Sequence, residues 1–559
     1  MSASREKQNR QAQPGQAGPK TAREAQQRKE QKRSNLLYGL IAAAFLIVVI
    51  LSAVWRTNLI PKMAPAASID GQNYNAGEIS YYYQSAYRNF VNNYSYFVSY
   101  LGLDTSLPLK GQEISQETAL MLGIDTGDAG EETPAGNEDA AAPAEGEDGE
   151  TPAEDEDAAA PEDTGTGMTW HEYFLDQALN NMATIQAGLK AAEAEGYAFS
   201  DSIQAQHDET MDSLRSAAAA SGVSVSQYLS ASFGGGITEK IYSDQLLRTL
   251  RYSDYSTAYV NSLQYSDSDL KAVYDGDPNT YDHVSYETVS FSGAAESTTD
   301  EDGNTVEPTE EESAAALDAA NEKAAAVVAA IQEGGNPETL ADEHEGTYNK
   351  TESGSYTAGS ALSEWLYNPA REPGEAAVVT DGTNLYAVVF HERFRDEYNT
   401  VNVRHILIGK GTATLSEEDE GYAEEQEKLT ADAHAKAEEV LAQWQSGEAT
   451  EDSFAALALT ESTDPGSRFN GGLYQRVYEG QMVETFNDWC FDASRKSGDT
   501  GLVDTDYGTH VMYYVGTDLP RWQAQTAQVL ENEDYTEWET ALTANTNIER
   551  HDFGMKFVG

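Results

Sequence analysis

The sequence predicts an α+β protein with an N-terminal transmembrane helix, a helical domain, two tandem α/β modules and a C-terminal helix that returns to the helical domain. Three observations predict this fold class. Residues 36–55 run for 20 positions without a charge, enough to cross a bilayer core of about 30 Å. Residues 67–265 carry apolar and aromatic side chains at helical spacing. Residues 283–518 contain an internal repeat in which strand and helix patterns alternate.

The composition limits the partners and the chemistry. The 559 residues exceed what one hydrophobic core accommodates, so we expect several domains. Because 35 Lys and Arg face 94 Asp and Glu, the net charge is -59, which argues against nucleic acid as a partner. Cys490 is the only cysteine, which excludes an intrachain disulfide and a thiolate zinc cluster. We interpret it as an inert, partly buried residue.

The N-terminus predicts a membrane topology. Residues 1–35 form a basic tail, and the apolar run 36–55 follows it directly. Under the positive-inside rule the tail is cytoplasmic and the bulk of the chain extracytoplasmic, so we expect a single-pass protein of the cell membrane. The alternative is a cleaved signal peptide, because an A-x-A site occurs at 64–66.

The region 67–265 is expected to be a helical domain. An aromatic stripe near its start, from Tyr82 to Phe97, is typical of core packing. The acidic insert 125–167 interrupts the domain and lacks the apolar residues needed to fold. Weak calcium binding is an alternative role for these carboxylates. The last segment, 523–559, predicts a helix and a strand-like end, "HDFGMKFVG".

The internal repeat separates residues that keep the fold from residues particular to one copy. "NEKAAAVVAAIQEG" aligns with "HAKAEEVLAQWQSG", and 363–390 aligns with 487–515 with one gap. These alignments predict modules at 283–395 and 399–518. Thr288 then takes the place of His405 in "VNVRHILIGKG", and His510 falls against Leu385 or Tyr386.

The two histidines are candidates for a site. Strand alternation places His405 on one face with Val403 and Leu407. A lone histidine in a strand is more often a satisfied core residue. Because His510 can lie on the same surface of one sheet, and because the first module has neither histidine, we favour a site.

Five motifs in order resemble the parvulin-type peptidyl-prolyl isomerases. They are "VRHILI", the helix after it, "FAALALTESTDPGS" with "GG", "GQMVETF" and "GLVDTDYGTHVMYY". The regions around this domain are similar to the export chaperones of the SurA and PrsA type. The resemblance implies a SurA-N-like chaperone domain at 67–265, a degenerate parvulin-like module at 283–395 and an isomerase domain at 399–518. It also implies that 523–559 packs on the chaperone domain.

The resemblance implies roles for eight residues. The catalytic set is His405, Asp464, His510 and Thr505, and the proline-binding set is Met482, Phe486, Tyr474 and Leu407, with Met482 and Phe486 four apart on one helix. Two departures stand out. The family's "GGDLG" is "GGLYQ" here, so Tyr474 replaces a leucine, and Tyr507 replaces a serine.

The implied reaction is rotation about an X-Pro bond, which breaks no bond and needs no cofactor or metal. The expected clients are unfolded or nascent exported proteins, and a dimer is one assembly state to test. The alternative is a holdase whose modules are both silent. A metalloenzyme is disfavoured because "WHEYF" lacks the second histidine of H-E-x-x-H, and a serine hydrolase because no G-x-S-x-G occurs.

Overall fold

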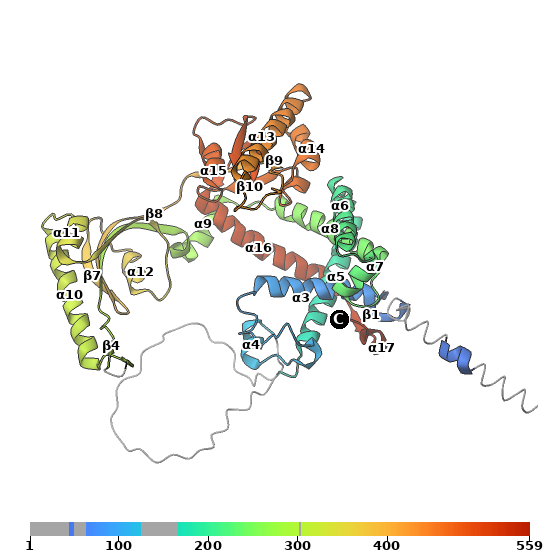
Figure 1. Cartoon of the computed structure of the whole chain (residues 1–559), viewed down its shortest axis with the longest axis horizontal. Coiled ribbons are helices and arrows are strands. Elements are labelled where there is room, and N and C mark those ends of the chain that lie inside the picture. Colours follow the sequence, from blue (N-terminus) through green and yellow to red (C-terminus); the bar gives the residue numbers. More distant parts are fainter. Residues whose placement is uncertain (1–43, 50–62, 125–165, 301–302) are drawn as a thin grey trace, which may run out of the picture. The chain divides into compact units, whose positions relative to one another are not determined.

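The computed structural model describes residues 44–49, 63–124, 166–300 and 303–559 (Figure 1). They divide into two compact units. The first comprises 1–197, 207–252 and 542–559, as far as these are described, and the second comprises 198–206 and 253–541. The acidic insert lies almost wholly outside the described residues.

The first unit is mostly helical. Its helices are α3 (Ala76–Asn93), α4 (Gln116–Met121), α5 (Trp170–Glu195), most of α6 (Ser202–Ala220), α7 (Val225–Phe233) and the start of α8 (Glu239–Ser262). A three-stranded sheet, ordered β13-β1-β2, pairs β1 (Pro65–Ile69) with β2 (Gln72–Asn75) and with β13 (Ile548–Arg550). The C-terminal segment thus joins the N-terminal strand. A short helix, α17 (Asp552–Met555), follows β13.

Aromatic side chains form the core between α3 and α5. The rings of Phe90, Trp170 and Phe174 lie with their centroids 5.2 to 5.8 Å apart. Helix α3 begins with a capping box in which the side chains of Asn75 and Glu78 each accept a hydrogen bond from the other's backbone N-H. The helix ends at Asn93, before the last residues of the predicted aromatic stripe. Phe97, the last of them, is 61% exposed, so only part of the stripe belongs to the core.

The second unit holds two similar modules. The first contains β3 (Asp282–Ser292), β4 (Thr298–Thr299), β5 (Thr305–Val306), α10 (Glu310–Gln332), α11 (Pro337–His344), β6 (Thr347–Gly354), α12 (Ala361–Leu366), β7 (Ala376–Asp381) and β8 (Asn384–Arg395). The second contains β9 (Asn399–Gly409), α13 (Tyr422–Ser446), α14 (Glu451–Glu461), β10 (Leu473–Val477), α15 (Glu484–Phe491), β11 (Thr500–Thr505) and β12 (Gly508–Pro520). Helices α9 (Asp267–Gly276) and α16 (Arg521–Thr543) flank them in the sequence.

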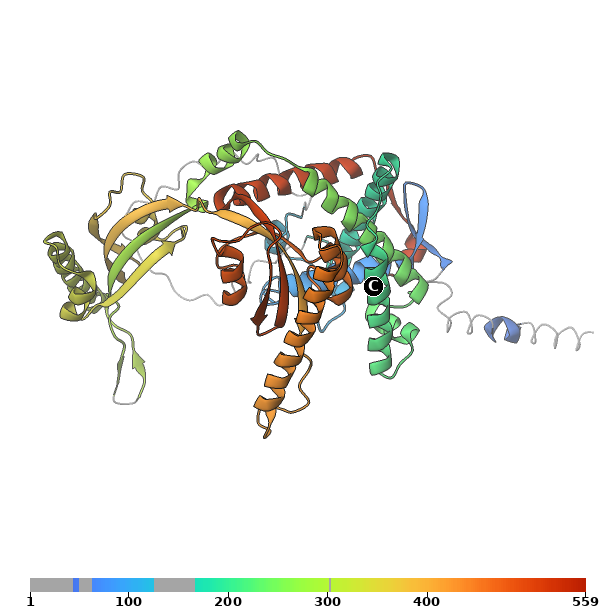
Figure 2. The same ribbon diagram turned by 90° about the horizontal axis from the view of Figure 1, so that it is seen from above.

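The two antiparallel sheets have the same order, β6-β3-β8-β7 and β10-β9-β12-β11. In the second module the long helix α13, orange in Figure 2, lies along one face of its sheet. Ile406, Ile408 and Val511 are buried beneath α13 and α14. The opposite face carries His405 and Met512, packed toward α15.

The strand registers align the modules without the gap that we expected between 363–390 and 487–515. Ser290 pairs with Tyr386 as Leu407 pairs with His510, so Tyr386 takes the place of His510. The same alignment also brings together two equivalent turns. In the first module Arg371 Nε donates to Trp365 O at 3.1 Å, and in the second Arg495 Nε donates to Trp489 O at 2.9 Å.

Three expectations need correction. The transmembrane helix in the predicted fold class, and the single-pass membrane localisation drawn from it, are wrong, because no helix among the described residues is long and apolar enough to cross a membrane. Of residues 36–55, only 44–49 are described, and residues 1–35 lie outside the description. Met482 precedes α15, which begins at Glu484. The C-terminal "DFGM" is helical, with His551 as its N-cap residue, and the strand lies just before it.

Candidate active site

The central strands β9 and β12 bring the two histidines together. Leu407 is the Cα partner of His510, and Met512 is that of His405, so the imidazoles lie diagonally on one face. His405 Nδ1 lies 2.9 Å from His510 Nδ1. Both residues are buried, at 2% and 6% exposure. The side-by-side placement expected from strand alternation is therefore confirmed.

The loop after α14 carries the carboxylate of the site. Asp464 Oδ2 accepts from His405 Nε2 at 3.0 Å and from the Ser467 hydroxyl at 2.5 Å. Ser462 holds the loop to β9, because its hydroxyl accepts from Leu407 N at 3.1 Å. Arg404, on the far face of β9, donates to the carbonyl of Gly471 at 3.0 Å.

Gly472 explains why the loop can approach β9 so closely. Its carbonyl accepts from His405 N at 2.8 Å, and its φ of +73° is in the left-handed region. A Cβ at this position would lie 2.2 Å from the carbonyl oxygen of His405. The glycine pair kept from the family pattern thus fixes the backbone beside the histidine.

Two further side chains extend the network. Thr505 Oγ1 lies 3.0 Å from His510 Nε2. The Tyr474 hydroxyl donates to Asp464 Oδ2 at 3.1 Å, and its ring stacks on His405 with centroids 5.0 Å apart. The structure therefore joins all four residues of the expected catalytic set into one hydrogen-bonded chain. Tyr474, expected to form the pocket wall, belongs to both the wall and the chain.

The network has a defined electrostatic character. The hydrogen bond from His405 is the largest cause that holds the pKa of Asp464 well below its usual range. Burial, together with the neighbouring His405, lowers the pKa of His510 to about 4. Burial and the charge of Asp464 raise the pKa of Tyr474 to about 12. At neutral pH the carboxylate is ionised, whereas the His510 imidazole and the Tyr474 phenol are neutral.

Apolar side chains lie against the imidazoles. The Phe486 ring meets His405 and His510 edge to face, with centroids 5.6 and 5.2 Å apart. Met482 and Tyr474 pack against the same cluster, and both are partly exposed, as is Leu407 on β9. The four expected pocket residues therefore lie on the face that carries the histidines.

Two serines of this site were not among the predicted residues. Ser467 bonds both Asp464 and His405, and Ser462 positions the strand and the loop. Both occur in the quoted "STDPGS", and a serine three residues after an aspartate in a turn was a usable signal.

Cys490 is buried, and burial raises the pKa of its thiol to about 12, so it is inert. In the described part of the chain, no cluster of three His, Cys, Asp or Glu is arranged to hold a metal.

The first module lacks the polar chain. Thr288, Tyr386, Asp381 and Leu362 stand where the second module has His405, His510, Thr505 and Phe486. The corresponding face is a hydrophobic cluster that includes Val388 and Phe390. The modules share their strand order and differ in the chemistry of this face.

Comparison with known proteins gives the family of the second module. Residues 386–515 match the family described as the PPIC-type PPIASE domain. The chain is 33% identical over 142 residues to Foldase protein PrsA 1 of Listeria innocua, which covers 25% of this chain and 39% of that protein. It is 32% identical over 196 residues to Foldase protein PrsA 1 of Listeria monocytogenes, a match that covers 32% of this chain and 58% of that protein. The chain thus spans less than two thirds of either relative.

Solved structures of PrsA are also similar. That of PrsA from Bacillus subtilis has 15% sequence identity and a TM-score of 0.25, covering 67% of this chain and 88% of that one. That of PrsA from Bacillus anthracis has 20% identity and a TM-score of 0.16, covering 27% and 58%.

Proposed function

We propose that this chain, which carries a parvulin-type peptidyl-prolyl cis-trans isomerase domain, isomerises X-Pro bonds and acts as a chaperone that assists the folding of exported proteins. The observation that supports this best is the hydrogen-bonded chain from Thr505 to Asp464 beside the Phe486 ring. We assign the isomerase domain to residues 399–518, a degenerate module to 283–395 and the chaperone domain to 67–265.

The carboxylate sets the direction of one hydrogen bond in the chain. Ionised Asp464 only accepts, so His405 Nε2 donates to it. The His510 imidazole is neutral because burial lowers its pKa to about 4, so a single proton lies between its Nδ1 and the Nδ1 of His405. At the other end of the chain, His510 Nε2 lies 3.0 Å from the Thr505 hydroxyl, which also lies 3.3 Å from the Gly508 carbonyl oxygen. The two histidines thus link Thr505 to Asp464 through hydrogen bonds.

The burial of the groups divides their roles. The side chain of His405 is 3% exposed, so it positions other groups and offers little surface to a substrate. Asp464 is 14% exposed, Tyr474 and Thr505 are partly exposed, and these three residues reach the surface of the site. We therefore assign substrate contact to Asp464, Tyr474 and Thr505, and positioning to the two histidines.

The chemistry requires only differential binding. The planar amide resists rotation with a barrier of about 18–20 kcal/mol, because its C-N bond has double-bond character that places negative charge on oxygen. A carboxylate near that oxygen disfavours the charge and so favours the twisted amide. Phe486, Met482, Tyr474 and Leu407 would hold the prolyl ring. No bond breaks, so the reaction needs neither a nucleophile nor a cofactor.

The clients we propose are unfolded exported polypeptides with X-Pro segments. The net charge of -59 favours encounter with basic segments of such chains. The alternative function is a holdase without isomerase activity. It is favoured by the first module, where Thr288 and Tyr386 replace the two histidines.

One pair of assays separates these functions. The full chain is given a proline-containing tetrapeptide and, separately, an aggregating unfolded protein. We expect isomerisation that is lost in His405→Ala and Asp464→Ala, with aggregation suppression retained. Suppression by a wild-type chain that leaves the tetrapeptide at its spontaneous rate would favour the holdase.

A further inference from the structure

The edge strand β10 carries a bulge directly after Tyr474. Its register against β9 shifts between Tyr474 and Val477, so Gln475 and Arg476 stand opposite the single residue Asn402. Two residues against one is the pattern of a β-bulge, a feature that redirects side chains and is common beside active sites. The bulge therefore lies where it can decide the direction of the Tyr474 side chain.

The backbone of Arg476 is strained. Its φ is +50°, in the left-handed region that residues with a Cβ rarely adopt. A glycine would take this φ without strain, yet the sequence has an arginine here. Strain of this kind persists only where the surrounding contacts hold it in place, and it gathers at functional sites. The contacts of Arg476 should therefore be what keeps the bulge.

The first contact is to the main chain of the bulge. Arg476 N donates to the side-chain oxygen of Asn402 at 2.8 Å, so a carboxamide takes the place of a strand partner. The Asn402 amide donates in turn to Asp518 Oδ2 at 2.6 Å. Asp518 lies on β12, so these bonds tie the bulge to the rest of its own sheet.

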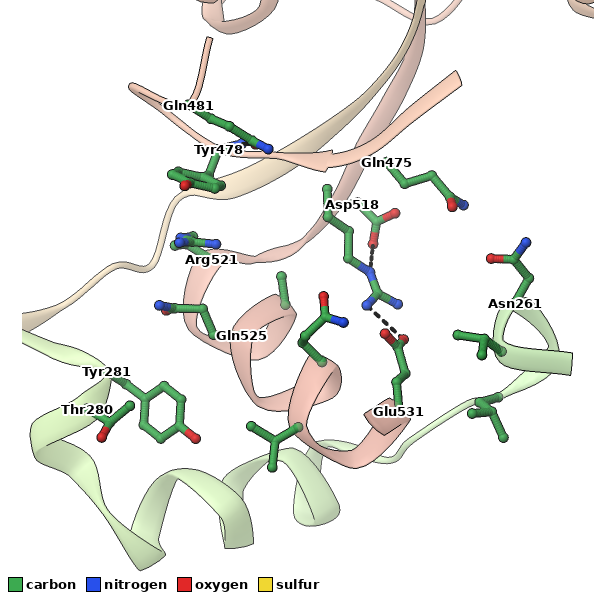
Figure 3. A pocket seen from close by; sticks show the side chains of 16 residues that line it. Asn261, Thr280, Tyr281, Gln475, Tyr478, Gln481, Asp518, Arg521, Gln525 and Glu531 are labelled. Atoms are coloured by element: carbon green, nitrogen blue, oxygen red, sulfur yellow. Dashed lines mark hydrogen bonds and ion pairs between the residues drawn. The ribbon is translucent and has the colours of Figure 1, made fainter. Parts of the chain in front are cut away.

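The second contact is an ion pair with α16. Arg476 Nη1 lies 2.8 Å from Glu531, and its Nε lies 4.0 Å from Asp518, at the wall of a cleft of about 570 Å³ (Figure 3). The Glu531 side chain is only 10% exposed. Removing one partner of such a pair leaves a charge with little access to water, so the pair resists separation more than a surface pair does.

The helix that holds the bulge lies outside the matched domain. The family match covers residues 386–515, and α16 begins at Arg521. A slip of one residue along a strand turns its side chains to the opposite face of the sheet. If the bulge moved along β10, Tyr474 would leave the face that carries His405, and its hydroxyl would lose the bond to Asp464.

We propose that Arg476 and Glu531 are positioning residues of the isomerase site. Helix α16 holds the strained bulge of β10 through this ion pair, and the bulge places the Tyr474 hydroxyl on Asp464. The proposal rests on the proposed function, because it assigns the residues that orient one of the groups in contact with the substrate.

The first test compares two substitutions at one position. Arg476→Ala and Arg476→Gly both remove the ion pair and leave Glu531 unpaired, but only glycine keeps the φ of +50° without strain. We expect Arg476→Ala in the full chain to lower kcat/KM for a prolyl tetrapeptide by about ten-fold, as release of one strained residue would. Arg476→Gly should stay close to the wild type. Equal losses in the two variants would overturn the proposal.

The second test separates positioning from loss of stability. Glu531→Gln should lower kcat/KM by about ten-fold, since the bulge loses the same ion pair. The matched control is Asp282→Asn in the first module, whose carboxylate is 8% exposed and lies 2.6 Å from Arg393 Nε. This change breaks an ion pair of similar burial and should leave the tetrapeptide kinetics unchanged. An equal loss in Asp282→Asn would mean that Glu531 acts on stability alone and would overturn the proposal.

The third test does not depend on turnover. The full chain has nine histidines, so selective ¹³C labelling of histidine gives few ring signals, and His405→Gln identifies that of His405 by its loss. The Tyr474 ring stacks on His405 with centroids 5.0 Å apart, so a moved tyrosine changes the ring current at this signal. We expect a shift in Arg476→Ala and Glu531→Gln, and none in Arg476→Gly or Asp282→Asn.

The outcomes are distinguishable from failure of the isomerase. A wild type without tetrapeptide activity would defeat the proposed function and leave the His405 signal readable in every variant. An unmoved His405 signal in Arg476→Ala would overturn the positioning proposal, even where the wild type is an active isomerase.

Discussion

His405 Nδ1 lies 2.9 Å from His510 Nδ1, although the two residues are 105 positions apart in the sequence. Two like nitrogens at this distance share one proton, so one ring donates and the other accepts. The carboxylate of Asp464 accepts from the other nitrogen of His405 and so holds that ring in place. This relationship makes the site sensitive to changes that alter protonation or backbone placement.

Stability should depend on pH through His510. Burial lowers its pKa to about 4 in the folded protein, against 6.5 when unfolded. Between these values the unfolded chain binds more protons, so stability falls as pH decreases from about 6.5 to 4, by about 3 kcal/mol. Urea unfolding of the full chain at several pH values measures this slope. In His510→Gln the slope should flatten, and an identical slope would contradict the assignment.

His434 should give the opposite pH dependence of stability. Its Nδ1 lies 2.9 Å from Asp504, and this bond is the main cause that raises the pKa of His434. A raised pKa gives stability that is present below about 6.5 and is lost as pH rises through the folded value. His434→Gln should therefore lower stability at pH 5.5 and have no effect at pH 8.5. A loss of equal size at both pH values would contradict the prediction.

Gly472→Ala should damage both the fold and the site. The new Cβ would lie 2.2 Å from the carbonyl oxygen of His405, at a φ of +73°. Backbone strain and overpacking together should lower the free energy of unfolding by about 2–4 kcal/mol, and tetrapeptide turnover should also fall. Gly480→Ala is the matched control, because its φ is +82° but no atom lies within 4 Å. A similar loss in both variants would mean that only the φ angle matters.

Phe486→Ala should weaken proline binding. Phe486 is 3% exposed and its ring contacts both imidazoles, so its removal should lower the free energy of unfolding by about 3–5 kcal/mol and raise the tetrapeptide KM. Leu362→Ala, at the equivalent position of the first module, should lower the free energy of unfolding by about 2 kcal/mol and leave the tetrapeptide kinetics unchanged. A change of KM in Leu362→Ala would show that the first module also binds the substrate.

Much of this site could be predicted, because its motifs are local. "VRHILI" and "THVMYY" each specify a strand and the face of its histidine, and the repeat shows which polar residues belong to one copy. Long-range register could not be read in this way. The absence of a gap between the repeats, and Tyr386 in place of His510, follow from strand pairing across the sheet.

The missed features depend on tertiary contact. Ser467 is an ordinary turn residue until the loop places its hydroxyl against Asp464 and His405. The cleft beside Arg476 forms from segments far apart in the sequence. The transmembrane prediction rested on the uncharged run 36–55 and the basic tail before it, and it was wrong for the part of the chain that the structure describes.

The most direct measurement is the rate of cis-trans isomerisation of a prolyl tetrapeptide by the full chain and by Asp464→Asn. This change keeps the size of the side chain and removes the charge that orders the network. The account predicts wild-type catalysis well above the spontaneous rate and a loss of about 100-fold in Asp464→Asn. Asp419→Asn, the same change in an exposed turn, should retain full activity. A wild-type rate equal to the spontaneous rate, or equal activity in Asp464→Asn and Asp419→Asn, would contradict it.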